Sequence, residues 1–137
     1  MWDKNKVIPM GEISGKVTNV TVQFAEEFGK YLAAKEENTD PLTTSQLRRF
    51  FGEVKRQQMT GYDETLFVML KPKLAYAVGR AKKNAKRNSW SKIEDFYNVL
   101  ADAIDKVGQC ANKQTAFKNF ITVFEAIVAY HKAAEKK

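Results

Sequence analysis

The chain has 137 residues, 44% of them hydrophobic and 28% charged, and a formal net charge of +7 at pH 7. This length suits one domain with its own hydrophobic core. The single cysteine, Cys110, and the single histidine, His131, exclude an intrachain disulfide and a zinc site built from several Cys and His ligands. The glycine-rich loops of classical nucleotide-binding sites are also missing.

Residues 1–12 have no hydrophobic period, which predicts a loose N-terminal arm. The arm lacks the apolar core of a signal peptide, and charges interrupt every apolar stretch well before the ~20 residues of a membrane span. We therefore expect a cytoplasmic chain with no membrane partner.

The next segment predicts a helix followed by a loop. Apolar residues recur every three or four positions from Val17 to Lys35, as on one face of a helix. The stretch Val20–Phe24 also alternates, so an extended start remains an alternative. Glu36 to Pro41 is polar and ends at a proline, which predicts a loop.

A second amphipathic helix is predicted after residue 43. Thr43 and Gln46 have the spacing of a capping box, in which each side chain bonds the other residue's free backbone N–H. Apolar residues then follow at helical spacing as far as Val54, and the helix is expected to end near Gly61.

A third helix is expected to begin at Asp63 or Thr65 and to break near Pro72, because proline cannot continue a helix without losing a hydrogen bond. Proline does suit the first turn of a new helix, which then runs to about Ala85 and ends before Asn88-Ser89.

Two more helices complete the chain. Ser91 and Glu94 suggest a second capping box, before an amphipathic helix that stops at Gly108. The last helix, about 114–134, has the widest apolar arc, so we expect it at the centre of the core. The sequence thus predicts an all-α fold: one domain over residues 1–137, a compact or elongated bundle of five to six helices.

Positive charge is concentrated in the middle of the chain. The net charge is −2 over residues 1–40, +3 over 41–60, +6 over 61–92 and zero over 93–137. Residues 41–92 therefore carry a net charge of +9, which exceeds the +7 of the whole chain. Such a block is typical of a site for a polyanion.

Helical geometry places this charge on two faces. In the helix after Pro72, cationic and aromatic residues lie opposite the apolar stripe: Lys73, Tyr76, Arg80, Lys83 and Arg87. In the helix after Thr43, the basic face holds Arg48, Arg49, Lys55 and Arg56. If the two helices pack side by side, these faces can join into one anion-binding surface, on which Tyr76 could stack against a base or serve only in helix packing.

Catalytic residues are not evident. His131 lies in the apolar arc of the last helix, where a structural role is expected, and Cys110 has no paired base. We therefore expect no enzyme activity and neither a cofactor nor a metal. A ribonuclease that uses Tyr, Lys or Arg without a metal remains a third class of function.

Three segments occur in an order that resembles a known family. They are 42–48 (LTTSQLR), 70–76 (LKPKLAY) leading to Gly79-Arg80, and 120–132 (FITVFEAIVAYHK). Over residues 42–132 the chain resembles the small subunit of the type III-A CRISPR effector, the Csm complex. Residues 1–40 carry no motif that contributes to this resemblance.

The resemblance implies a non-catalytic, all-helical subunit for antiviral defence. Copies of such a subunit stack inside a ribonucleoprotein with its backbone and large subunits. They contact the backbone of guide RNA and target single-stranded RNA without reading sequence, and a neighbouring backbone subunit cuts the target.

Carried over by position, Arg48 and Arg80 are the first candidates for RNA contact. Lys71 and Lys73 also lie in a matching segment, but could serve helix capping or subunit contact instead. Lys55, Lys83 and Arg87 rest on face geometry alone. The alternative function is a helix-turn-helix-like DNA-binding regulator, which would use the same basic helices.

Overall fold

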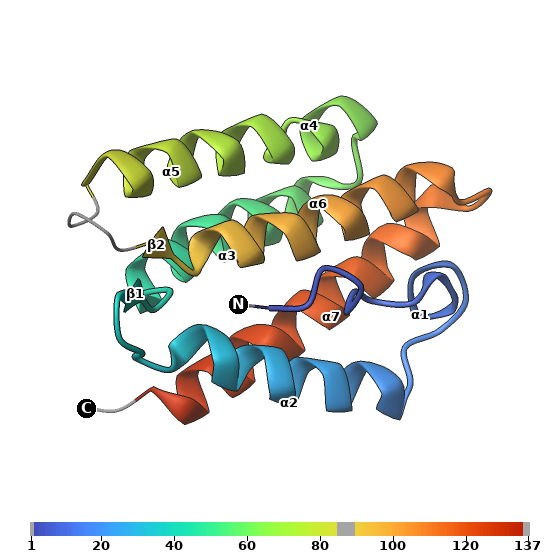
Figure 1. Ribbon diagram of the computed structural model, residues 1–137. Helices are drawn as coiled ribbons and strands as arrows, with labels where there is room; N and C mark the ends of the chain where they lie inside the picture. Colours follow the sequence, from blue (N-terminus) through green and yellow to red (C-terminus); the bar gives the residue numbers. More distant parts are fainter. Residues whose placement is uncertain (1, 85–89, 136–137) are drawn as a thin grey trace.

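The computed structural model describes residues 2–84 and 90–135, and it is a bundle of helices (Figure 1). Five helices have 15 or more residues, and they confirm the predicted all-α fold: α2 (Asn19–Ala33), α3 (Thr44–Thr60), α5 (Leu70–Asn84), α6 (Ile93–Gln109) and α7 (Lys113–Ala134). Two helices have five residues each: α1 (Met10–Ser14) and α4 (Glu64–Val68). Within the described residues, no helix is long and apolar enough to span a membrane.

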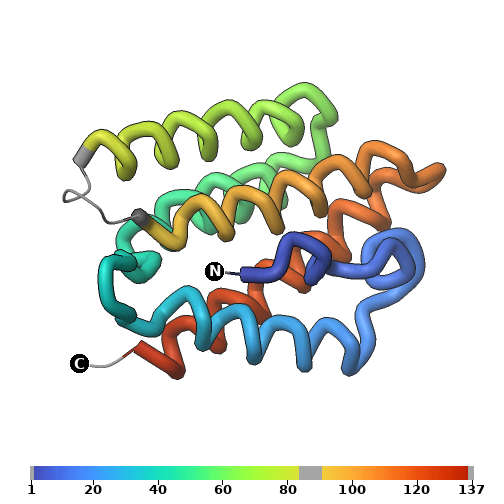
Figure 2. Tube along the Cα trace, in the orientation of Figure 1, coloured from blue at the N-terminus to red at the C-terminus, as the bar shows by residue number. Residues whose placement is uncertain are grey.

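Helix α7 lies at the centre of the bundle, as its apolar arc predicted. It packs against α1, α2, α3 and α6, while α5 lies on the outer side of α6 (Figure 2). Phe120 is fully enclosed, with ring centroids 5.1 Å from Phe67 of α4 and 6.1 Å from Phe124. Through Phe67, these aromatic contacts connect the short helix α4, which precedes α5, to the central helix α7.

Local sequence sets the beginnings of α3 and α4. The Thr43–Gln46 capping box forms, with Gln46 N donating to Thr43 Oγ1 at 3.1 Å and Thr43 N donating to Gln46 Oε1 at 2.9 Å. Asp63 caps α4 through a 2.9 Å bond from Leu66 N. The expected break falls at Met69, which places Pro72 in the first turn of α5.

The predicted capping box at Ser91 and Glu94 is wrong. Ser91 belongs instead to the two-residue strand β2 (Trp90–Ser91), which pairs in parallel with β1 (Thr39–Asp40) in the segment predicted to be a loop. Lys92 therefore becomes the N-cap of α6, and its side chain makes no capping bond.

The buried side chain of Lys92 closes the end of α2. Its Nζ donates to the carbonyl oxygens of Tyr31 at 2.7 Å and Ala34 at 2.8 Å, and it lies 4.1 Å from the centre of the Tyr31 ring. Burial lowers the pKa of this ammonium group, while the nearby Glu36 carboxylate acts in the opposite direction.

The expectation of a loose arm over residues 1–12 is wrong for the part that the structure describes. The Trp2 ring lies 4.8 Å from the Phe28 ring centroid, Ile8 is fully buried, and α1 begins at Met10. These contacts join residues far apart in sequence, so no local period reveals them.

Candidate nucleic-acid interface

A groove of about 660 Å³ lies between α3 and α5. We call it the α3–α5 groove. Helix α3 contributes Arg49, Phe50 and Glu53 to its walls, among other residues. Helix α5 contributes residues that share one helical face: Lys73, Tyr76, Ala77, Arg80 and Ala81. The groove exists because α5 presents small alanines toward α3, while its larger residues Leu74 and Val78 are buried.

The structure brings three of the sequence-predicted site residues together in this groove. Lys73, Tyr76 and Arg80 line it, all three are exposed, and Tyr76 as a whole residue is 70% exposed despite its large ring. Of the four basic residues predicted on the face of α3, Arg48, Arg49, Lys55 and Arg56, only Arg49 lines the groove with them.

Arg49 lines the same groove from α3, although it was not among the residues chosen from the sequence. Helical geometry had placed it on the basic face, but the resemblance favoured its neighbour Arg48. Arg48 is exposed on α3 and does not line the groove. What distinguishes the two arginines is the position of α5, because only Arg49 lies on the side of α3 that borders the groove.

The remaining predicted residues lie elsewhere. Lys55 forms an ion pair with Glu125 of α7 at 3.8 Å. Lys71 binds Asp105 of α6 at 2.8 Å, and this hydrogen bond raises the pKa of the lysine. Lys83 is exposed near the end of α5 outside the groove, and Arg87 falls outside the described residues.

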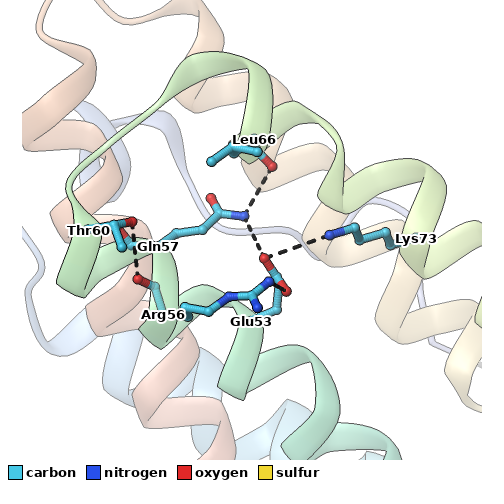
Figure 3. A network of polar contacts seen from close by, with 6 residues as sticks. All are labelled: Glu53, Arg56, Gln57, Thr60, Leu66 and Lys73. Atoms are coloured by element: carbon cyan, nitrogen blue, oxygen red, sulfur yellow. Dashed lines mark hydrogen bonds and ion pairs between the residues drawn. The ribbon is translucent and has the colours of Figure 1, made fainter.

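Glu53 is the centre of a polar network on the groove wall (Figure 3). Its side chain is only 19% exposed, and its carboxylate binds Arg56 and accepts a 3.3 Å bond from Gln57 Nε2. Lys73 Nζ lies 3.7 Å away across the groove. The Arg56 hydrogen bond, with the other two contacts, holds the pKa of Glu53 below its usual value despite partial burial.

The cations in and beside the groove therefore differ in whether a carboxylate lies close enough to neutralise their charge. Lys73 and Arg56 form ion pairs with Glu53. Neither Arg49 nor Arg80 lies within 4.0 Å of a carboxylate oxygen in residues 2–84 and 90–135. Asp40 contributes a second carboxylate at one end. Two guanidinium groups beside one hollow, neither paired with a carboxylate of the described residues, are suited to binding an anion.

The family of this chain follows from comparison with known proteins. A family model described as Csm2 Type III-A matches residues 15–137. Comparisons with curated proteins and with solved structures gave no match. The matched region is longer than the 42–132 resemblance and includes α2, the α3–α5 groove and the central helix α7. The chain therefore belongs to the Csm2 family, the small subunit of the type III-A CRISPR (Csm) complex.

Proposed function

We propose that this subunit is a non-catalytic RNA-binding protein that contacts the phosphate backbone of guide and target RNA in antiviral defence in the cytoplasm. One observation carries the proposal. The α3–α5 groove gathers Arg49, Lys73, Arg80 and the exposed Tyr76 along two rigid helices. Family membership gives this basic site its setting in a ribonucleoprotein.

The spacing of the cations suits a polyanion. The two cations that α5 contributes, Lys73 and Arg80, lie seven residues apart, which is about two helical turns or ~10.5 Å, and Tyr76 lies between them. Phosphates also repeat along an RNA strand, and a guanidinium group can donate two parallel hydrogen bonds to one of them. Such contacts carry no sequence information, so binding should be independent of base sequence.

The two candidate catalytic groups lie away from this groove. His131 is fully buried and its Nε2 lies 2.7 Å from the Leu42 carbonyl oxygen, while Cys110 contacts the Lys106 carbonyl oxygen. Both side chains have structural surroundings, which supports a binding role for the protein without one in catalysis.

Protein partners would be the backbone and large subunits and further copies of this chain. Exposed apolar side chains near the α3–α4 turn support such contacts: Met59 (87% exposed), Leu66, Val68 and Met69. Neighbouring exposed apolar residues commonly mark protein-interaction surfaces.

The test is the salt dependence of binding to labelled single-stranded RNA, followed by fluorescence anisotropy. The logarithm of affinity should fall with the logarithm of salt concentration by about 0.7 per phosphate contact. The double variant Arg49→Ala/Arg80→Ala should bind more weakly, with a salt slope smaller by about 1.4. Its affinity should fall by the same factor for RNAs of unrelated sequence. Lys118→Ala, an exposed lysine of α7, is the control and should match the wild type.

Two results would contradict the proposal. One is an affinity that salt does not change, and the other is an arginine double variant that binds like the wild type. A strong preference for one duplex DNA site would instead support the DNA-binding alternative.

A further inference from the structure

We infer that the α3–α5 groove takes a nucleobase as well as phosphates, so that one unstacked nucleotide of a single-stranded RNA enters it. This inference rests on the proposed function and adds the part of the RNA that is bound. A surface that contacts only phosphates needs exposed cations and no hollow. The groove has about 660 Å³, which is within the usual range for pockets that enclose small molecules.

The lining of the groove suits the flat face of a base. Phe50 and Ile93 are buried residues of the core whose accessible parts border the groove, and Ala77 and Ala81 border it from α5. Because alanines stand where larger residues would fill the gap, apolar surface is left open between two helices. A base can cover this surface, whereas a phosphate cannot do so favourably.

The rim supplies the groups that the rest of a nucleotide needs. Tyr76 borders the groove and is 70% exposed, so its ring is available to stack on a base. Arg49 and Arg80 border the same hollow on opposite helices and can bind the phosphates on either side of that base.

These charges favour a nucleotide over an apolar protein segment as the occupant. An apolar helix in the groove would cover Arg49 and Arg80 without giving them counter-charges, and burying unpaired charges is unfavourable. A nucleotide brings an apolar face for the hollow and an anion for the rim. Stacking is tolerant of base identity, so this binding agrees with sequence-independent recognition.

The experiment compares one single-stranded RNA with an oligomer of the same length and charge that lacks its bases. With the full chain, the affinity for the abasic oligomer should be lower than that for normal RNA by at least about five-fold, and the salt slope should be the same. Ala77→Leu fills the groove and should reduce affinity for normal RNA toward that of the abasic oligomer, without changing affinity for the abasic oligomer itself. Ala75→Leu makes the same change at an exposed position of α5 outside the groove, and it should have no effect.

Tyr76→Ala provides an independent variant, because an exposed side chain can be removed without opening the core. It should lower affinity for normal RNA only. Equal affinity for the two oligomers would overturn the inference and leave the proposed phosphate contacts standing. A preference for normal RNA that survives both Ala77→Leu and Tyr76→Ala would place base binding elsewhere and would also overturn it. Failure to bind either oligomer would contradict the proposed function itself.

Discussion

Arg48 and Arg49 are neighbours on α3 with different surroundings. Both are exposed, but only Arg49 lines the α3–α5 groove. We predict that Arg49→Ala weakens RNA binding about ten-fold, as expected for losing a charged hydrogen bond of roughly 1.5 kcal/mol. Arg48→Ala, the matched control, should change affinity by less than about two-fold. Anisotropy titrations at one salt concentration measure both, and a larger effect of Arg48→Ala would contradict the groove as the contact site.

Glu53 opposes anion binding, because it holds Lys73 and Arg56 in ion pairs. Glu53→Gln should release both cations and strengthen RNA binding by a few-fold, with a steeper salt slope. Glu125→Gln is the control, since Glu125 pairs with Lys55 away from the groove. The same titrations test this prediction, and weaker binding by Glu53→Gln would show that the carboxylate supports the site.

Most of these residues were predictable from the sequence, but which of them line the groove was not. Periodicity placed Arg48, Arg49, Lys73 and Arg80 on exposed basic faces, which depends only on local helix geometry. Which of them share a groove depends on the neighbour that each helix meets. Lys71 illustrates this limit, since its partner Asp105 lies 34 residues away on α6.

At the scale of helices, α1 stabilises the start of α2. The buried Glu12 carboxylate accepts hydrogen bonds from the backbone N–H groups of Thr18 (2.8 Å) and Thr21 (3.1 Å) and from both hydroxyl groups at 2.7 Å. Burial alone would raise the pKa of Glu12, but these four bonds together lower it below 4.5.

Glu12→Gln should therefore reduce the free energy of unfolding at pH 7 by about 2 kcal/mol. Because the pKa of Glu12 is lowered in the folded state, the carboxylate contributes its full amount to the free energy of unfolding well above pH 4.5. This contribution declines as the pH falls through the folded-state pKa. The difference between wild type and variant in urea unfolding should accordingly shrink below pH 4.5. A difference that stays constant with pH would contradict the role of the charge.

The contact between α2 and α7 depends on a glycine. A Cβ atom on Gly29 would lie 2.8 Å from the His131 backbone nitrogen and 2.8 Å from Tyr130 Cβ, closer than such atoms approach. Gly29→Ala should lower the free energy of unfolding by about 1–3 kcal/mol. Gly52→Ala in α3 meets no atom within 4 Å and is the control, expected to stabilise by about 0.5–1 kcal/mol. Thermal unfolding checks both, and an equally stable Gly29→Ala would contradict the close packing.

Helix boundaries were largely predictable, because caps and breaks are local. The Thr43–Gln46 box and the break before Pro72 follow from residues within one turn of each other. The Ser91 prediction failed because the β1–β2 pairing joins residues about 50 positions apart, Asp40 with Ser91. A two-residue strand leaves no periodic signal.

For the whole molecule, the central place of α7 was predictable and the packing of the N-terminal segment was not. The apolar arc of α7 is wide enough to require neighbours on several sides. Trp2 is an isolated aromatic residue and Ile8 lies in a short apolar run that follows polar residues, and the packing of both depends on surfaces that the other helices create. The α3–α5 groove also emerges at this scale, from small residues between two helices that α4 connects.

The most direct test of the proposed RNA contact uses the assembled complex. RNA carrying a photoreactive uridine analogue would be bound, irradiated and digested, and the cross-linked peptides of this subunit identified by mass spectrometry. We predict cross-links in α3 and α5, with Tyr76 among the modified residues, and the loss of these cross-links in Arg49→Ala/Arg80→Ala. Cross-links confined to α2 or α7, or none from this subunit while others react, would contradict this prediction.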